Sequence, residues 1–381
     1  MKMQPFVMER WQSVWENCVE LNISESGVQP MTLEELAGDA QTLASIAQTA
    51  LGYPQTNGSE ATRAGVARLY QGASVANVLM TAGCAEANFL VTLGLVEEGD
   101  DVVIVQPNYM QVAGVARALG ANVRVVWLRE ELGWQPDVDE LRRAITPKTK
   151  LVALCNPNNP TGATLDERTM DDITVALEKS GAWLLADEVY RGAEREKETT
   201  PSFWGRYERA ICTCGMSKSY GLPGLRIGWI VAPEAVTEKL WGYHDYTTIA
   251  ITALSDRLAG LVLEPERHTR IIERTRGIIR AQYPIVAEWV ARHGDSFAHV
   301  PPAAGAIAWL RYKNGPPSDE LAETLRVKHS TLIVPGSQFE MEHHMRVGFG
   351  YRADTLRRAL ERVDEQLRTM NSELRTQTAS T

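Results

Sequence analysis

The chain has 381 residues, of which 44% are hydrophobic and 23% are charged, and its formal net charge is −9. This length exceeds what one hydrophobic core normally supports, so we expect two domains. The acidic balance argues against a nucleic-acid-binding protein, because such proteins carry a basic surplus or a basic stripe.

No stretch of the sequence approaches the roughly 18 consecutive apolar residues of a membrane span. Residues 1–15 contain Lys2, Glu9 and Arg10 and lack the apolar core of a secretory signal. The five cysteines are odd in number and scattered, which argues against a disulfide framework or a zinc site. We therefore expect a cytoplasmic protein that does not contact membranes.

The N-terminal segment, residues 1–28, begins with a helical pattern rich in aromatic and apolar residues and ends in a short extended piece. Further on, residues 52–59 form a turn-rich segment that contains Tyr53. Helical patterns lie on either side of this segment, over residues 32–38, 41–51 and 60–70.

The middle of the chain alternates between short apolar strands and helical patterns. This alternation is typical of an open, mainly parallel sheet with helices on both faces. Ligands of such sheets bind beyond the carboxyl ends of the strands. We expect strands over residues 78–81, 101–105, 122–128, 149–155, 182–186, 210–214 and 225–232.

The C-terminal part predicts a compact α+β sheet domain. A helix over residues 249–263 and an amphipathic helix over 270–293 lead into it. Strands follow over residues 304–310, 330–335 and 345–349, then a last helix over 351–370 and a polar tail that we expect to be frayed. The predicted domain boundaries are 1–45 for an arm and part of the small domain, 46–270 for the large domain and 271–381 for the small domain.

A lysine lies on the loop between two of the predicted strands. Lys218 follows a buried strand and is flanked by Ser217 and Ser219. An amine held at a strand end can lose its proton through desolvation and then attack a carbonyl carbon. Arg226 lies on the same loop, and its planar guanidinium would suit a phosphate.

Other strand ends also carry polar or aromatic groups. The strand over 78–81 passes through Gly83, Cys84 and Ala85 into a helix, and a helix N-terminus is a ready anion site. Tyr109 can stack on a flat ring. Asp187 ends an apolar strand, where a carboxylate is costly unless it meets a cation.

The run from Ser217 to Trp229, Ser-Lys-Ser-Tyr-Gly-Leu-Pro-Gly-Leu-Arg-Ile-Gly-Trp, closely resembles the cofactor-lysine segment of class I and II aminotransferases. These are fold-type I enzymes that depend on pyridoxal 5′-phosphate (PLP). The resemblance implies that Lys218 forms the Schiff base with PLP and that Arg226 binds its phosphate, with Ser217 also in the cofactor site. The family usually has a serine at the position of Gly215, so we expect fewer side chains around the phosphate.

The resemblance covers nearly the whole chain and assigns further residues of the cofactor and substrate sites. Gly83, Cys84 and Ala85 would face the phosphate, mainly through backbone amides. Tyr109 would stack on the pyridine ring, and Asp187 would pair with its nitrogen.

Two more groups would contact the phenolic oxygen and the substrate. Tyr190 and Asn159, the latter from the Asn-Pro-Thr-Gly motif, would bind the cofactor's phenolic oxygen. Asn159 and Arg346 would hold the substrate α-carboxylate. The matching Tyr53 would reach the phosphate of a second subunit's cofactor, which implies a homodimer with shared active sites.

The fold implied is α/β, with a seven-stranded, mainly parallel sheet between helices and a small α+β domain. The activity implied is transfer of an amino group from an L-amino acid to a 2-oxo acid, with Lys218, Asp187 and Tyr190 as catalytic residues. No metal is expected, and Glu188 is assigned a structural role. His244 is expected to be a solvated loop residue and is not assigned.

Two alternatives remain open. A lyase or cyclase could use the same lysine, because a leaving group at the β or γ carbon changes the outcome of the same proton abstraction. The Gly-Leu-Pro-Gly-Leu-Arg segment and the following Asp-Tyr-Thr-Thr resemble capreomycidine synthase, a cyclase, and C–S lyases share the fold. The other alternative is a regulator's effector domain, which would usually follow an N-terminal DNA-binding domain.

Overall fold

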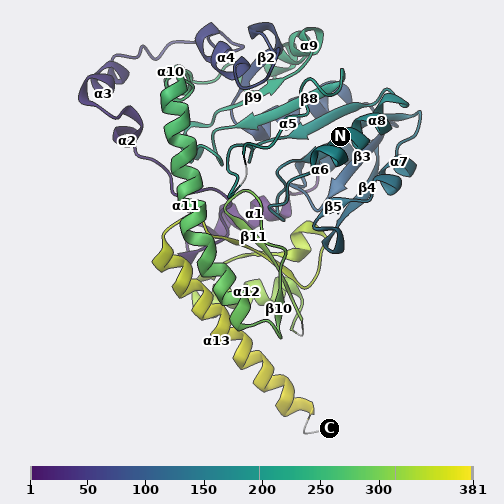
Figure 1. Ribbon diagram of the computed structural model, residues 1–381, viewed down its shortest axis with the longest axis vertical. Helices are drawn as coiled ribbons and strands as arrows, with labels where there is room; N and C mark the ends of the chain where they lie inside the picture. The colour runs from purple at the N-terminus through teal and green to yellow at the C-terminus, as the bar shows by residue number, and fades with distance from the viewer. Residues whose placement is uncertain (1, 197, 314, 379–381) are drawn as a thin grey trace.

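The computed structural model describes residues 2–196, 198–313 and 315–378, with side chains up to residue 369. Figure 1 shows a large sheet with its helices above a smaller sheet, and one long helix, α11 (Pro265–Arg292), that runs alongside both. Within these residues, no helix is long and apolar enough to cross a membrane.

The large sheet has eight strands in the order β2-β9-β8-β7-β6-β3-β4-β5. Only β9 and the two-residue β5 run against their neighbours, so the expected mainly parallel sheet is confirmed, with β5 added to the seven expected strands. The strands are β2 (Val78–Thr81), β3 (Asp101–Gln106), β4 (Asn122–Arg129), β5 (Gln135–Pro136), β6 (Thr149–Cys155), β7 (Trp183–Asp187), β8 (Ala210–Gly215) and β9 (Gly228–Val231).

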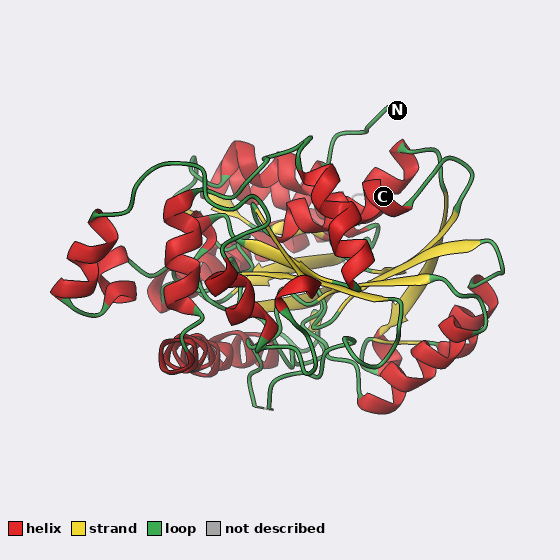
Figure 2. Cartoon of the chain, turned by 90° about the horizontal axis from the view of Figure 1, so that it is seen from above, coloured by secondary structure: helices red, strands yellow, loops and turns green. Residues whose placement is uncertain are grey.

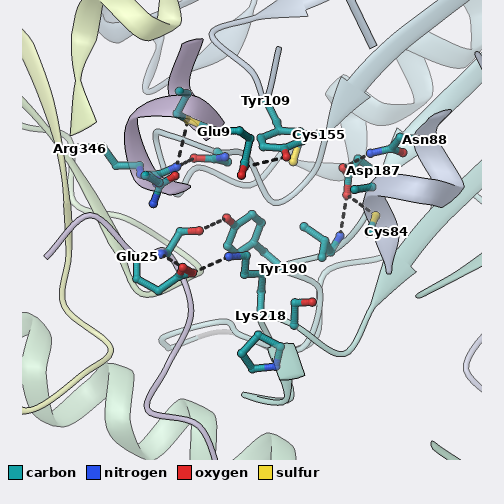
Figure 3. A pocket seen from close by; sticks show the side chains of 18 of the residues that line it. Glu9, Glu25, Cys84, Asn88, Tyr109, Cys155, Asp187, Tyr190, Lys218 and Arg346 are labelled. Atoms are coloured by element: carbon teal, nitrogen blue, oxygen red, sulfur yellow. Dashed lines mark hydrogen bonds and ion pairs between the residues drawn. The ribbon is translucent and has the colours of Figure 1, made fainter. Parts of the chain in front are cut away.

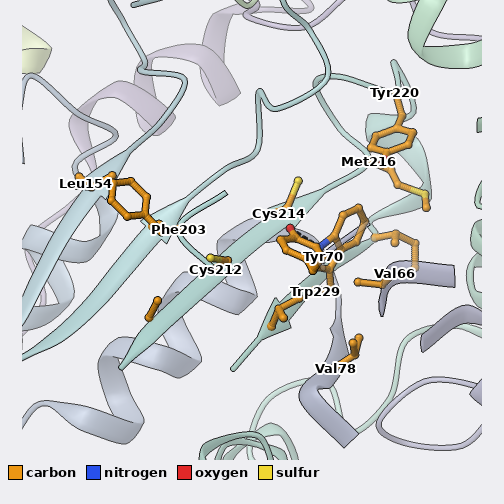
Figure 4. Packing of buried hydrophobic residues seen from close by; sticks show 14 of the residues in the cluster. Val66, Tyr70, Val78, Leu154, Phe203, Cys212, Cys214, Met216, Tyr220 and Trp229 are labelled. Atoms are coloured by element: carbon orange, nitrogen blue, oxygen red, sulfur yellow. Dashed lines mark hydrogen bonds between the residues drawn. The ribbon is translucent and has the colours of Figure 1, made fainter. Parts of the chain in front are cut away.

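Helices cover both faces of this sheet (Figure 2). Successive side chains of a strand point to opposite faces, so Val103 and Val105 belong to one core cluster and Val102 and Ile104 to another. In the first cluster, the Trp229 indole N–H donates to the Tyr70 hydroxyl at 3.1 Å (Figure 4). The helices are α4 (Glu60–Ala67), α5 (Cys84–Leu95), α6 (Gln111–Ala118), α7 (Val138–Ala144), α8 (Glu167–Glu178), α9 (Glu234–His244) and α10 (Ala253–Val262).

The small domain contains an antiparallel sheet in the order β10-β11-β14-β13. Its helix α13 (Ala353–Thr378) continues past residue 370, so the expected frayed tail is wrong as far as Thr378, and residues 379–381 lie outside the described residues. The remaining elements are β10 (Phe297–Ala298), β11 (Ile307–Tyr312), α12 (Ser318–His329), β12 (Thr331–Leu332), β13 (Val334–Pro335) and β14 (His344–Gly348).

The N-terminal arm packs on the small domain. Its strand β1 (Leu21–Asn22) pairs with β12 in parallel, and the Gly348 amide donates to the Ile23 carbonyl at 2.7 Å. Leu21, Ile23 and Val28 are part of the small-domain core. The arm also contains α1 (Val7–Trp15). The helices α2 (Leu33–Ala37) and α3 (Ala40–Ala47) follow it and lie beside α10 and the start of α11 (Figure 1).

Two expected elements begin later than the sequence indicated, because their first residues adopt left-handed backbone conformations. Ile249 has φ of 66°, so the expected helix over 249–263 starts at Ala253. Arg226 has φ of 51° after a 3₁₀ turn (Pro223–Leu225), so the expected strand over 225–232 starts at Gly228. The expected domain boundaries stay predictions, and α11 runs without interruption across the one at residue 270.

We predict that Gly348→Ala destabilises the protein by about 2 kcal/mol, because the added methyl group would collide with the carbonyl oxygen of Glu25 in the arm. Urea unfolding of the variant and the parent protein measures the difference. Gly277→Ala in α11 is the matched control, since nothing lies within 4 Å of its added methyl. That control should gain about 0.5–1 kcal/mol from helix propensity. An unchanged midpoint for Gly348→Ala would contradict the tight docking of the arm.

Candidate active site

A cavity of about 350 Å³ lies where the carboxyl ends of the large-sheet strands, the start of α5, the arm and β14 meet. Figure 3 shows this cavity, with Lys218, Tyr190 and Glu25 in one group and Asp187, Asn88 and Cys84 in another. The expected site residues that line it are Cys84, Ala85, Tyr109, Asn159, Asp187, Tyr190, Ser217, Lys218, Arg226 and Arg346. Tyr53 is not among its lining residues, and Gly83 directly precedes α5 at its edge.

Lys218 follows β8, and its ammonium Nζ lies 2.7 Å from Oε1 of Glu25. Desolvation is the largest single effect and lowers the pKa of Lys218, but the negative charge of Glu25, the Tyr190 phenol and the hydrogen bond to Glu25 together outweigh it and raise the pKa above its ordinary value. Desolvation therefore acts on Lys218 as the sequence suggested, but the contact with Glu25 opposes it in this structure. The Lys218 charge in turn lowers the pKa of Glu25 to about 2.

Sequence reasoning missed Glu25, which lies 193 positions from the lysine along the chain. The backbone amide of Ser26 also donates to Oε1 of Glu25, at 3.0 Å, and fixes the carboxylate. Nothing in the local sequence of the arm indicates this contact. The only available signal was the resemblance, because in the resembled family such an arm packs on the small domain and runs past the mouth of the active site.

The start of α5 and Arg226 form a cradle for a phosphate-sized anion. Nη1 of Arg226 donates to the Ser217 hydroxyl at 3.4 Å and to the Pro223 carbonyl at 3.1 Å. Among the described residues, no carboxylate lies within ion-pair distance of this guanidinium. Gly83, with φ of 92°, lets the guanidinium lie against the helix start, because a Cβ there would be 2.5 Å from Nη2. A cation and free amide groups therefore converge on one point.

Close backbone packing explains why Gly215 replaces the family's usual serine. A Cβ at residue 215 would lie 2.8 Å from the Ile227 carbonyl oxygen and 3.3 Å from the Cys84 nitrogen. Gly228 is equally confined, since its Cβ would meet the backbone of Gly83 and Cys84. The ends of β8 and β9 thus approach the start of α5 too closely for a side chain. The cradle consists of backbone amides, Arg226 and Ser217.

Asp187 ends β7 and is buried, with 8% of its surface exposed. It accepts hydrogen bonds from the Asn88 side chain at 2.8 Å and the Val189 amide at 3.0 Å. Burial raises the pKa of Asp187. No cation is within ion-pair distance in the described parts of the chain, so a protonated pyridine nitrogen would supply the missing partner.

Asn88 is a second residue that sequence reasoning missed. The Thr213 hydroxyl donates to its amide oxygen at 2.6 Å, which turns the amide NH₂ towards Asp187. Asn88 lies one helical turn after Cys84, so both reach the same side of α5. The Cys84 thiol itself lies 3.5 Å from the Asp187 carboxylate. The four-residue spacing from Cys84 was therefore the sequence signal that could have identified Asn88 as a site residue.

Both expected tyrosines of the cavity contact the arm. The Tyr190 hydroxyl donates to the Ser26 hydroxyl at 2.9 Å, and the Tyr109 hydroxyl donates to Glu9 at 2.8 Å. Burial raises the pKa of Tyr190 and of Tyr109, so both phenols stay protonated at neutral pH. Tyr53 lies elsewhere and is 87% exposed, and its role towards a second subunit stays a prediction.

The other end of the cavity is built to receive a carboxylate. Arg346 on β14 is only 1% exposed. Its Nη1 donates to Asn159 at 2.9 Å and its Nη2 to the Ser24 carbonyl at 2.7 Å, while Nε has no partner. No carboxylate of the described residues lies within ion-pair distance of it, and burial lowers its pKa. A bound anion would supply the counter-charge that this buried guanidinium lacks.

Two residues outside the catalytic set have structural roles. Glu188 is buried and accepts hydrogen bonds from the Ser202 hydroxyl and the Phe203 amide, consistent with its assigned role. His244 is not a solvated loop residue, because α9 extends to it and packing buries it completely. Its ring lies 3.4 Å from Glu86, which also accepts from Thr248 at 2.8 Å. This contact ties the first turn of α5 to the segment after α9.

Comparison with known proteins places this geometry in a family. Residues 16–363 match the model of the class I and II aminotransferases. Capreomycidine synthase from Streptomyces vinaceus is 32% identical over 351 residues, 91% of this chain and 90% of that enzyme.

Two solved structures are similar over nearly their whole length. A PLP-dependent aminotransferase from Streptococcus suis superposes with a TM-score of 0.91 at 34% identity, over 97% of this chain and 99% of that one. The PLP-dependent cyclase OrfR superposes with a TM-score of 0.87 at 26% identity, over 97% and 98%. The chain is thus similar both to an aminotransferase and to a cyclase, which carry out different reactions with PLP.

We predict that Glu86→Gln lowers stability by about 1–2 kcal/mol at pH 7 and that this difference disappears in acid. Burial alone would raise the pKa of Glu86, but hydrogen bonds from His244, Thr247 and nearby groups lower it from 4.5 to about 2. A lowered folded pKa stabilises the protein above about pH 4.5, and this contribution is lost as the pH falls towards 2.

Unfolding temperatures of both proteins between pH 7 and about pH 2 measure the effect. Glu266→Gln is the matched control, because Glu266 also lies in the first turn of a helix but is exposed. A Glu86→Gln difference that stays constant with pH would contradict the assigned titration.

Proposed function

Because this chain belongs to the class I and II aminotransferase family, whose members depend on PLP, we propose that it transfers an amino group from an L-amino acid to a 2-oxo acid. One observation carries this proposal. Arg346, buried without a carboxylate partner in the described residues, lines the same cavity as Lys218. A carboxylate receptor beside a reactive amine suits an α-amino acid.

The residues of the cavity fit PLP. Arg226, Ser217 and the amides at the start of α5 would hold the phosphate. Asp187 would hold the pyridine nitrogen in its protonated form, and Asn88 and Val189 would orient that carboxylate. When bound there, PLP supplies an electron sink that stabilises negative charge at the substrate α-carbon. The remaining expected contacts are Tyr109 on the ring, and Tyr190 and Asn159 at the phenolic oxygen.

The residues of this chain would then act on the substrate in a definite order. Arg346 and Asn159 hold the α-carboxylate and thereby orient the Cα–H bond. Lys218, once its Nζ is free, removes the proton from the α-carbon as a general base. The arm segment that contains Ser24 and Ser26 contacts Arg346 and Tyr190 at this end of the cavity and would help to exclude water from it.

The second candidate is a PLP-dependent cyclase or lyase, and the similarity to capreomycidine synthase and OrfR favours it. Such an enzyme would use the same carboxylate receptor and the same proton abstraction. The outcome would differ because a leaving group departs from the β or γ carbon of the substrate. A C–S lyase activity belongs to the same class of outcome.

We also propose that the enzyme works as a homodimer in which Tyr53 reaches the second active site. Two large side chains near residue 52 and one in the segment after α9 are strongly exposed in a single chain. Leu51 is 86%, Tyr53 87% and Tyr246 87% exposed. A second subunit would cover such side chains, which a monomer would leave in water.

The visible absorbance of the purified holoenzyme, before and after addition of single amino acids, tests the proposed transfer. We expect the PLP band to be replaced by a pyridoxamine phosphate band with one class of amino acid, and to return when a 2-oxo acid is added. A PLP band that persists while ammonia, pyruvate or a cyclic product accumulates would support the cyclase or lyase instead.

Lys218→Ala should abolish turnover and the covalent PLP band, since no other lysine of the described residues lines the cavity. Its far-ultraviolet circular dichroism should match that of the parent protein. Lys239→Ala on the exposed side of α9 is the control and should keep full activity. Substantial transamination by a correctly folded Lys218→Ala protein would refute the assignment.

A further inference from the structure

We propose that the amino acid used by this enzyme carries a positive charge at the end of a long side chain, such as a guanidinium or an ammonium, and that Glu16 and Glu25 bind this charge. This inference rests on the proposed function, because it names the substrate class of the same cavity. It follows from the distribution of charge on the cavity walls and from the partners of each charged group.

The charges of the cavity do not balance without such a ligand. Its cations are Lys218, Arg226 and Arg346, and its carboxylates are Glu9, Glu16, Glu25 and Asp187. The phosphate would take Arg226, the substrate α-carboxylate Arg346, and the pyridine nitrogen Asp187. Only Lys218 is then left for the three carboxylates of the arm, and the cofactor itself engages Lys218.

Glu25 already binds an ammonium group in this structure. Lys218 Nζ lies 2.7 Å from its carboxylate, and the Ser26 amide holds the carboxylate in place. The Glu25 side chain is only 26% exposed, so loss of this partner leaves a largely desolvated negative charge. Once Lys218 is bound to PLP, another cation is needed at this position.

Glu16 has no such partner. Among the described residues, no hydrogen bond or ion pair reaches its carboxylate. Burial first, and then the negative charges of Glu25 and Glu9, raise the pKa of Glu16. Glu16 also follows the last residue of α1, where the carbonyl end of a helix favours a cation. A bound cation would relieve each of these unfavourable effects.

A separate observation shows where the rest of the ligand lies. The buried Arg346 has no carboxylate partner among the described residues and lies against the arm, whose Ser24 carbonyl accepts from it, so it would hold the α-carboxylate at this end of the cavity. With the α-carboxylate there and the α-carbon beside Lys218, the substrate side chain would extend along the arm, whose Glu16 lines the same cavity. Glu16 is partly exposed, whereas Arg346 and Asp187 are buried, so Glu16 lies towards the open side of the cavity. A long side chain would extend to this open side of the cavity, which Glu16 lines.

Substrates with acidic or apolar side chains would fit the carboxylate-lined side of the cavity poorly. An acidic side chain would meet the carboxylates of Glu9, Glu16 and Glu25 at close range, which is unfavourable in a partly desolvated site. An apolar side chain would displace water from these carboxylates without offering them a hydrogen bond. A cationic side chain is the one that gains from all three.

The test uses holoenzyme without a 2-oxo acid and compares amino acids of matched shape. L-Arginine is compared with its neutral analogue L-citrulline, and L-lysine with L-norleucine. The half-saturating concentration for the absorbance change should be about tenfold lower for each cationic member. Glu16→Gln and Glu25→Gln should each reduce this ratio by about threefold or more. High salt should also reduce it.

Glu34→Gln in α2 is the matched control, because Glu34 is exposed and lies outside the cavity, and its ratio should equal that of the parent enzyme. Equal use of citrulline and arginine, or a preference for acidic amino acids, would overturn the inference while leaving the proposed function intact. A preference for arginine that Glu16→Gln does not reduce would refute the assignment of Glu16. If no amino acid changes the spectrum and no product forms, the proposed function fails and this inference fails with it.

Discussion

The site depends on two buried charges that the described part of the chain leaves without counter-ions. Asp187 and Arg346 lie on different walls of one cavity, and each has neutral hydrogen-bond donors or acceptors but no opposite charge. Burial raises the pKa of Asp187 and lowers the pKa of Arg346, and therefore favours the neutral form of each side chain. Such an arrangement costs stability unless ligands complete it. A pyridinium nitrogen at Asp187 and a carboxylate at Arg346 would restore both charges, so the cavity is organised for two ligands before either arrives.

The arm links these charges to the rest of the fold. Its Ser24 carbonyl accepts from Arg346, its Ser26 hydroxyl accepts from Tyr190, and Glu25 between them holds Lys218. The same few residues are anchored on the small domain through the hydrogen bond from Gly348 to Ile23. The carboxylate receptor, a cofactor-facing tyrosine and the reactive lysine therefore share one support. A change in the docking of the arm would alter all of them together.

The sequence predicted groups that follow local rules. Asp187 is the last residue of one apolar strand and Lys218 follows another by three residues, and parallel strands bring their carboxyl ends to one edge, so their convergence was foreseeable. Glu25 was not, because its contact with Lys218 depends on how the arm crosses the cavity. His244 is buried at the end of α9, a helix that was not predicted from the sequence. The reason for Gly215 appeared only when the distances between three backbone segments were known.

The Lys218–Glu25 pair also connects substrate recognition with proton transfer. A general base must be unprotonated, yet the Glu25 charge raises the pKa of Lys218 for as long as the two face each other. If a substrate cation takes over Glu25, the attraction that raises this pKa is removed and desolvation, which lowers it, remains. A cationic side chain would then release the lysine for its role at the α-carbon. A neutral substrate would leave Glu25 free to hold Lys218 protonated, so selectivity would arise in the proton-transfer step as well as in binding.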